Sequence, residues 1–232
     1  MNKITVAIDG YSSTGKSTVA RQLADSLGYV FVDSGSMYRA VTLFAMRNRY
    51  ISLKGFDKSK IENCLPKISL NFKKENERSN AEIYLNGENV EREIRTMEVS
   101  ELVSAVATIS AVRKKLVREQ KKMGEKKGIV MDGRDIGTFV FPNAELKIFM
   151  TASSETRARR RYDELIKRGD IVAYNDVLRN VRERDHIDST REQSPLMKAK
   201  DAIEIDNSDM NKEDQFHIIL QLAKDRIAGR LL

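Results

Sequence analysis

The stretch ITVAIDGYSSTGKST, from Ile4 to Thr18, decides the fold of this chain. It opens with an apolar run that contains β-branched residues, which predicts a buried strand. The letters GYSSTGKS that follow match the pattern G-x-x-x-x-G-K-[ST], in which a loop leaves a strand and leads into a helix. The N–H groups of such a loop point inward at phosphate oxygens, and its lysine reaches the outer phosphates. The stretch therefore predicts a nucleoside triphosphate site.

The residues after the loop predict a helix from Ser17 to Leu27, with Gly28 as its stop signal. The positive end of this helix faces the phosphates, and the Ser17 hydroxyl is offered to Mg²⁺. A chance glycine-rich turn is the alternative, but the strand and helix on either side disfavour it. We assign the triphosphate contacts to Gly10, Tyr11, Ser12, Ser13, Thr14, Gly15, Lys16, Ser17 and Thr18.

Short apolar runs that suit buried parallel strands recur along the chain. They are Ile4–Ile8, Tyr29–Asp33, Gly128–Asp132, Leu146–Met150 and Ile203–Asp206. Helical patterns separate them, and the first two flank a helix to give a right-handed βαβ unit. The predicted fold class is therefore a three-layer α/β sandwich, with functional residues at the carboxyl ends of its strands.

Two segments depart from this alternation. Residues 66–90 contain two short strand patterns, a polar connection around residues 73–80 and an Asn86-Gly87 turn, which predict a small antiparallel insertion. Residues 154–193 contain two charged helical stretches that are rich in arginine and broken at Gly169-Asp170. We interpret this second segment as a lid that excludes water from the phosphates.

The spacing of the arginines in the lid segment indicates an anionic ligand. On a helix, Arg157 and Arg161 share one face, and Arg184, Asp188 and Arg191 share another. Planar, bidentate guanidinium groups suit phosphate, although a salt-bridged surface helix remains an alternative for any single arginine. Phosphoryl transfer needs such groups, because it depends on positioning and charge neutralisation.

The composition of the chain favours some classes of protein and argues against others. The 232 residues carry a net charge of +7, which favours an anionic partner, and aromatic residues make up only 6% with no Trp, which argues against a stacking surface for nucleic acid. The single cysteine, Cys64, and two distant histidines argue against an internal disulfide and a structural metal site. No run is long enough to span a membrane and the N-terminus leads into a strand, so we expect a cytoplasmic protein without membrane or nucleic-acid partners.

Other polar segments allow two interpretations. Asp132 ends a strand, where a carboxylate either helps to hold Mg²⁺ or caps a turn. Asp33-Ser34-Gly35 is either a helix-capping turn or, with Arg39, a contact for a phosphate acceptor. Asn211-Lys212-Glu213-Asp214 matches the guanine-binding N-K-x-D pattern, but it does not leave a strand, and Asp209 or Asn211 is better interpreted as a helix cap.

Four motifs together resemble the bacterial cytidylate kinases, and the similarity runs nearly end to end. They are DSGSMYR at 33–39, EIRT at 93–96, DGRDIGT at 132–138 and RDHIDSTR at 184–191. The resemblance implies a nucleoside monophosphate kinase fold, with a five-stranded parallel core, a monophosphate-binding insertion and a helical lid. It also implies transfer of the γ-phosphate of MgATP to CMP or dCMP, which gives CDP or dCDP and ADP. We expect the enzyme to be a monomer.

The resemblance also assigns residues and boundaries. It places the CMP contacts at Ser34, Arg39, Ser104, Arg113, Arg134, Asp135, Arg184, Asp188 and Arg191. The groups expected to act in phosphoryl transfer are Lys16, Arg134, Arg157, Arg161 and Arg191, with Ser17 and Asp132 on Mg²⁺. The expected core comprises residues 1–63, 99–153 and 194–232, the insertion residues 64–98, and the lid residues 154–193.

One departure from the family concerns the phosphate loop. Many relatives have a more glycine-rich loop, whereas Tyr11, Ser12, Ser13 and Thr14 fill all four variable positions here. Ser13 must therefore adopt whatever backbone the tight turn demands.

Two other classes of protein would explain part of this sequence. A different small-molecule kinase or a GTPase would explain the phosphate loop, and an RNA-binding protein would explain the basic charge. The cytidylate kinase hypothesis ranks first, because two highly anionic substrates already explain the basic charge.

Overall fold

The computed structural model describes residues 2–73 and 81–230, and the chain separates into two compact units. The first unit comprises the residues up to Asp33 together with those from Lys121 onward. The second is the continuous segment Ser34–Gln120. The phosphate loop and the arginine-rich segment therefore belong to the same unit.

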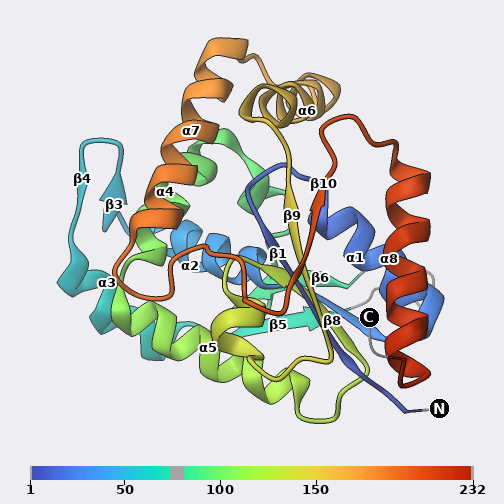
Figure 1. Cartoon of the computed structure of the whole chain (residues 1–232). Coiled ribbons are helices and arrows are strands. Elements are labelled where there is room, and N and C mark those ends of the chain that lie inside the picture. The colour runs from blue at the N-terminus through green and yellow to red at the C-terminus, as the bar shows by residue number, and fades with distance from the viewer. Residues whose placement is uncertain (1, 74–80, 231–232) are drawn as a thin grey trace. The chain divides into compact units, whose positions relative to one another are not determined.

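The first unit is built on a five-stranded sheet in the order β10-β9-β1-β8-β2, in which every neighbouring pair is parallel (Figure 1). Its strands are β1 (Thr5–Gly10), β2 (Val30–Asp33), β8 (Ile129–Gly133), β9 (Leu146–Thr151) and β10 (Ile203–Asp206). Each predicted strand is present, so the predicted fold class is confirmed. The first strand in the sequence lies at the centre of the sheet, which places the loop that follows it over the middle of the carboxyl edge.

The register of the sheet brings polar residues together at that edge. Asp132 on β8 lies opposite Asp33 on β2 and Ile8 on β1, and Gly133 lies opposite Asp9. The side chains that end three neighbouring strands are therefore adjacent. This arrangement confirms the expectation that polar residues gather at the strands' carboxyl ends.

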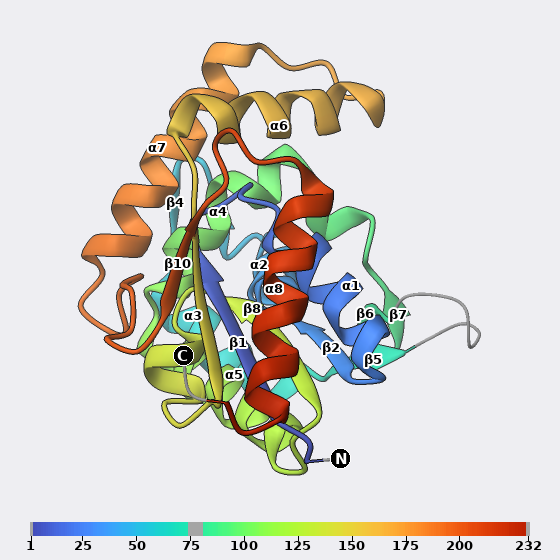
Figure 2. The ribbon, with the colours of Figure 1, turned by 45° about the vertical axis from the view of Figure 1, so that its right-hand side comes forward.

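Helices α1 (Lys16–Leu27) and α8 (Lys212–Ile227) pack beside each other on one face of this sheet (Figure 2). Their buried residues, including Leu23 of α1 and Ile219 of α8, join the strands in one apolar cluster. Gly28, in the left-handed conformation, ends α1 as predicted. Asn211 caps α8 by accepting a 2.8 Å hydrogen bond from the N–H of Asp214, which confirms its interpretation as a cap.

The arginine-rich segment forms two packed helices, α6 (Ser154–Lys167) and α7 (Tyr174–Thr190). Ser153 caps α6 through a 3.1 Å hydrogen bond from the N–H of Thr156, and Gly169 has a φ of 92° in the connection between the helices. One expectation needs correction: Arg191 does not share a helical face with Asp188, because α7 ends at Thr190 and Arg191 has extended backbone. A one-turn π-helix, η3 (Ile136–Val140), follows β8.

The second unit contains a three-stranded antiparallel sheet, β5-β6-β7, which confirms the predicted antiparallel insertion. Asn86 and Gly87 both have positive φ angles, 50° and 91°, as the hairpin turn between β6 and β7 requires. Of the polar connection predicted around residues 73–80, Lys73 ends β5, and residues 74–80 lie outside the described residues. The bounds of the strands are Ile51–Ser52 (β3), Gly55–Phe56 (β4), Leu70–Lys73 (β5), Glu82–Leu85 (β6) and Glu88–Asn89 (β7).

The helices of the second unit include α2, which packs on α4. Their bounds are Ser34–Arg47 (α2), Lys58–Cys64 (α3), Leu65–Lys67 (η1), Glu93–Arg95 (η2), Met97–Ala107 (α4) and Ser110–Gly124 (α5), the last residues of α5 belonging to the first unit. The functional division into core, insertion (64–98) and lid (154–193) stays a prediction. Within residues 2–73 and 81–230, no helix is long and apolar enough to cross a membrane.

Candidate functional site

The phosphate loop occupies the turn between β1 and α1. Gly10, at its start, has a φ of 145°, and a Cβ atom there would lie 2.0 Å from the carbonyl oxygen of Met150. Only glycine therefore allows β1 to run this close to β9 at the point where the loop begins. At the other end, the Gly15 carbonyl accepts hydrogen bonds from the N–H groups of Thr18 and Val19 and so begins α1.

The middle of the loop contains a non-glycine residue with left-handed backbone. Ser13 has a φ of 60°, a region that residues other than glycine, asparagine and aspartate rarely occupy. The loop thus reaches its turn without glycine at its four variable positions, at the cost of local strain at Ser13. The concern that the sequence raised about this residue is confirmed.

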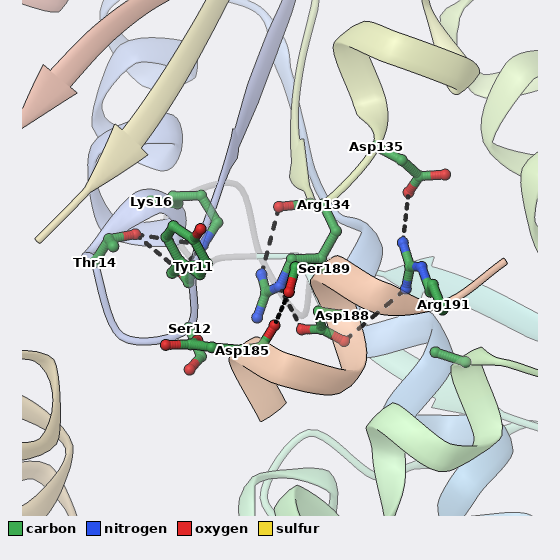
Figure 3. Close-up of polar contacts among 12 residues, drawn as sticks. Tyr11, Ser12, Thr14, Lys16, Arg134, Asp135, Asp185, Asp188, Ser189 and Arg191 are labelled. Atoms are coloured by element: carbon green, nitrogen blue, oxygen red, sulfur yellow. Dashed lines mark hydrogen bonds and ion pairs between the residues drawn. The ribbon is translucent and has the colours of Figure 1, made fainter. Parts of the chain in front are cut away.

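Lys16 is buried at the first position of α1 and points back along the loop. Its Nζ donates hydrogen bonds to the Tyr11 carbonyl, at 2.5 Å, and to Oγ1 of Thr14, at 3.4 Å (Figure 3). Burial lowers the pKa of Lys16, and the nearby charge of Arg134 lowers it further, while Asp132 opposes the shift. An ammonium group that is buried among other cations is arranged for a strongly anionic ligand.

Ser17 and Asp132 meet at the same edge, as predicted for magnesium ligands. The Ser17 hydroxyl donates to Oδ2 of Asp132 over 2.8 Å. Burial raises the pKa of Asp132, and the adjacent carboxylate of Asp33 adds to this effect, while Lys16 and Ser17 oppose it. A hydroxyl group that contacts one carboxylate, with a second carboxylate on the neighbouring strand, offers the hard oxygen donors that Mg²⁺ prefers, so these residues fit that ion.

Asp9, just before the loop, belongs to a polar strand end that the sequence marks, but it is not among the predicted site residues. Its two carboxylate oxygens accept hydrogen bonds from the N–H groups of Ile136 and Gly137, at 2.8 and 2.7 Å. Burial raises the pKa of Asp9 to about 6, although these two hydrogen bonds oppose the shift. Asp9 therefore holds the DGRDIGT segment against the start of the phosphate loop.

The DGRDIGT segment and the end of α7 form a compact ionic cluster (Figure 3). Nε of Arg134 donates to Oδ2 of Asp188 over 2.9 Å. Arg191, which is buried, lies 3.8 Å from Oδ1 of Asp135 and 4.0 Å from Oδ1 of Asp188, and it donates to the Ser194 carbonyl. Four of the predicted CMP-contacting residues of the first unit are thus brought together.

Arg184 and Arg161 add more positive charge to this cluster. Arg184 is buried, and burial together with the charges of Arg134 and Arg161 lowers its pKa to about 10. Burial alone would raise the pKa of Asp188, but Arg134, Arg184 and Arg191 hold it below its ordinary value. Guanidinium groups that repel one another at one buried location indicate an anion-binding centre, because an anion relieves the repulsion.

Arg157, predicted to act from the lid, joins α6 and α7 to the phosphate loop. Its guanidinium group makes two hydrogen bonds to the carboxylate of Asp185, at 3.0 and 2.6 Å, and one of 3.4 Å to the Ser12 carbonyl. It also lies over the ring of Tyr11, 5.1 Å from the centroid. Arg161 lies one turn further along the same helix, where it pairs with Glu164 at 2.9 Å.

The remaining predicted CMP contacts belong to the second unit. Arg39 on α2 donates to the Ile94 carbonyl over 3.3 Å, which connects α2 to the EIRT segment. Arg113 is buried and lies over the ring of Tyr38, 5.6 Å from its centroid. Ser34 and Ser104 are also buried, at the start of α2 and within α4. Their contact with a nucleotide stays a prediction.

Two further residues were missed because their partners are remote in the sequence. Arg160 lies in the arginine-rich segment but has no predicted role, yet both terminal nitrogens of its guanidinium group donate hydrogen bonds to Asn207. The side chain of Asn207 in turn contacts Thr14 in the phosphate loop, 193 residues away. No local pattern marks such a contact, although the polar Asn207-Ser208 after a strand end is a signal of the kind that marks functional edges.

Comparisons with known proteins agree on one family. The family model described as cytidylate kinase matches residues 6–225. Curated cytidylate kinases are similar along their whole length: the protein of Flavobacterium johnsoniae is 64% identical over 97% of this chain and 98% of its own, and that of Flavobacterium psychrophilum 61% over 97% and 100%. The cytidylate kinase of Phocaeicola vulgatus is 53% identical over 93% of this chain and 94% of its own.

Proposed function

The chain belongs to the cytidylate kinase family, and we propose how its residues transfer the γ-phosphate of MgATP to CMP or dCMP. As in the family, the activity is the phosphorylation of CMP by ATP, which yields CDP and ADP. An oxygen of the CMP phosphate forms a bond to the γ-phosphorus, while the bond from that phosphorus to the bridging oxygen of ADP breaks. No nucleophile from the protein is needed, so the residues act by positioning and by electrostatic stabilisation.

The donor nucleotide is proposed to bind at the phosphate loop. The loop N–H groups and the amino end of α1 face the phosphates, and Lys16 adds a positive charge. The contacts of Lys16 with the Tyr11 carbonyl and Thr14 support this role, because they hold its Nζ along the loop. Its flexible side chain exchanges these neutral partners for phosphate oxygens, which are stronger acceptors for an ammonium group.

Ser17 and Asp132 are proposed to hold Mg²⁺, with Asp132 acting directly or through water. These two residues would hold the ion beside the ATP phosphates, where Mg²⁺ would supply positive charge to offset the negative charge that develops during transfer. The 2.8 Å contact between Ser17 and Asp132 supports the assignment, because it places a neutral and an anionic oxygen donor side by side. The neighbouring Asp33 carboxylate makes this edge favourable for a cation.

The acceptor nucleotide is proposed to bind the ionic cluster of the first unit. Arg134, Arg184 and Arg191 suit the CMP phosphate, and Asp135 and Asp188 suit polar groups of the base or sugar. A carboxylate accepts a hydrogen bond from the cytosine amino group, which uracil lacks, and this difference favours CMP over UMP. We propose nucleotide contacts for Ser34, Arg39, Ser104 and Arg113 as well.

The single observation that carries this assignment is the concentration of buried positive charge around Lys16. Arg134 and Arg184 both lower the pKa of Lys16, and Arg134 and Arg161 lower that of Arg184, so Arg184 lies within electrostatic reach of the other three groups. Neighbouring carboxylates such as Asp132 and Asp188 oppose these shifts, but both pKa values stay lowered, so the arrangement favours the binding of a further anion. The transferred phosphoryl group with its donor and acceptor phosphates supplies that anion.

The function of the lid, the location of the enzyme in the cell and its oligomeric state are also proposals. Arg157 and Arg161 on α6 are proposed to close over the transferred phosphoryl group and exclude water, which competes with CMP as the acceptor. We further propose that the enzyme acts as a cytoplasmic monomer. Its basic charge is explained by its two anionic substrates.

A coupled assay of ADP production tests the assignment, with CMP, dCMP, UMP and AMP compared as acceptors. We expect kcat/KM to be highest for CMP or dCMP, and activity to require a divalent cation. A large preference for UMP or AMP would exclude the cytidylate assignment and retain the kinase class. Hydrolysis of ATP without transfer to any of the four acceptors would contradict the proposal altogether.

A further inference from the structure

Asn207 connects the end of the sheet to the phosphate loop. It follows β10 directly, and its backbone N–H continues the ladder by donating to the Thr151 carbonyl over 2.9 Å. The residue is 2% exposed. Nδ2 donates to the carbonyl oxygen of Thr14 over 2.7 Å and also to Oε1 of Gln215 on α8. The buried side-chain amide of Asn207 therefore has both of its N–H groups in use.

The acceptor side of the same amide is also used. Nη1 of Arg160 on α6 donates to Oδ1 of Asn207 over 2.9 Å, and Nη2 donates to its backbone carbonyl over 2.7 Å. Arginine can only donate and a backbone carbonyl can only accept, so these partners fix which side of the amide is oxygen and which is nitrogen. Neither Asp nor Leu, which have nearly the same shape as Asn, makes both sets of contacts.

The bond to Thr14 determines the direction of a loop N–H group. The carbonyl of Thr14 and the N–H of Gly15 belong to one planar trans peptide, so they point in opposite directions. Because Asn207 holds the Thr14 carbonyl toward itself, the Gly15 N–H is directed away from Asn207. Gly15 has a φ of 88°, and nothing lies within 4 Å of the position that a Cβ atom would take there, so no side chain at this position restrains the peptide.

We propose that Asn207 is a positioning residue for the donor nucleotide, which holds the Thr14–Gly15 peptide with its N–H toward the ATP phosphates. The inference rests on the proposed use of the phosphate loop for ATP. Asn207 acts through the loop, since its own side-chain hydrogen bonds are made to Thr14, Arg160 and Gln215. Arg160 fixes the amide in the orientation that this role requires.

The variants Asn207→Asp and Asn207→Leu test this role. Asp keeps the oxygen that faces Arg160 but has no N–H for Thr14, and Leu removes both contacts without adding charge. We expect each to raise KM for ATP about tenfold, the effect of a lost buried hydrogen bond, and to leave KM for CMP within about twofold. If Asn207→Leu does not fold, Asn207→Ala provides the same neutral comparison.

Gln215→Met is the matched control, because it removes a partner of the same amide without touching the loop. We expect it to lower the melting temperature and to leave KM for ATP within about twofold. Equal increases in both KM values for the Asn207 variants, or an unchanged KM for ATP, would overturn the proposal. An effect of Asn207→Asp that neither Leu nor Ala reproduces would also overturn it, by assigning the loss to added charge.

Calorimetric titration with ATP alone separates this inference from the proposed function. The measurement needs no turnover, so it remains informative even if CMP is not phosphorylated. We expect wild-type protein and Gln215→Met to bind ATP with similar Kd values, and both Asn207 variants to bind about tenfold more weakly. Equal Kd values for all four proteins would overturn the role of Asn207, whatever the acceptor proves to be.

Discussion

The hydroxyl group of Ser17 donates a 2.8 Å hydrogen bond to Oδ2 of Asp132, a residue 115 positions further along the chain. This pair joins the first turn of α1 to the carboxyl end of β8. If both residues hold Mg²⁺, Ser17→Ala will raise the Mg²⁺ concentration needed for half-maximal activity about tenfold, the usual scale for a lost residue at a metal site. Activity measured against Mg²⁺ at saturating ATP gives this value.

Ser17→Thr is the control for this experiment, because the loop pattern accepts either hydroxyl side chain. We expect it to retain nearly the wild-type Mg²⁺ dependence. If Ser17→Ala lowers activity with no change in the Mg²⁺ requirement, the hydroxyl group has a structural role and is not a metal ligand.

Arg191→Ala is expected to lower kcat/KM for CMP by at least about a hundredfold, because it removes a buried cation from the proposed acceptor site. Arg191→Lys keeps the charge but loses the planar fork, so we expect an intermediate loss. Steady-state kinetics with CMP as the varied substrate measure both. Wild-type kcat/KM in Arg191→Ala would remove this residue from the site and leave it as a salt-bridging residue near Asp135.

Asp9 gives the unfolding free energy a specific pH dependence. Burial raises its pKa to about 6 in the folded protein, from an ordinary value of 3.8. A carboxyl group whose pKa is raised by folding contributes fully to the free energy of unfolding when the pH is below its pKa in the unfolded chain. This contribution is lost as the pH rises through its pKa in the folded protein. Relative to wild type, Asp9→Asn should therefore gain up to about 3 kcal/mol of unfolding free energy between pH 4 and pH 7.

Urea unfolding of wild type and Asp9→Asn at several pH values measures that change. Asp25→Asn, on the exposed side of α1, controls for the general loss of one carboxylate. The substitution also alters the hydrogen bond to the Gly137 N–H, which changes the unfolding free energy at every pH. The prediction therefore concerns how the difference in unfolding free energy between Asp9→Asn and wild type changes with pH. A difference that stays constant from pH 4 to pH 7 would be incompatible with a raised pKa at Asp9.

Ser13→Gly is expected to stabilise the free protein. Ser13 has a φ of 60°, and removing Cβ relieves a left-handed conformation that costs about 1 kcal/mol for an ordinary residue. Ser12→Gly is the comparison, because Ser12 is not among the residues with positive φ and gains nothing from the change. Thermal unfolding should show a higher melting temperature for Ser13→Gly only; a lower one would mean that the loop does not strain Ser13.

Much of the fold follows from local sequence patterns. The five apolar runs end within a few residues of the observed strands, because β-branched residues and flanking helices specify a buried parallel sheet. The Asn86-Gly87 turn and the Asn211 cap were predicted for the same reason: each depends on chemistry within a few residues. The interruption at Gly169 is likewise a local property of the backbone.

The candidate site was less predictable, because its contacts join distant segments. The spacing of arginines predicted a helical face that includes Arg191, but α7 ends one residue earlier and Arg191 reaches Asp188 from extended backbone. The role of Asp9 depends on the η3 segment, which lies 127 residues away. The contact of Asn207 with Thr14 depends on how β10 joins the sheet.

The central place of β1 in its sheet has a consequence for the order in which the newly made chain folds. Both neighbours of β1, β8 and β9, begin more than a hundred residues later, at Ile129 and Leu146. At a synthesis rate of roughly 5–20 residues per second, β1 therefore leaves the ribosome about ten seconds before either neighbouring strand, and it has no strand to pair with during that time. The second unit is one continuous segment, Ser34–Gln120, so all residues that contact one another within it are synthesised before β8 and β9. We therefore expect it to become compact first, while the strand that starts the chain is among the last to be paired.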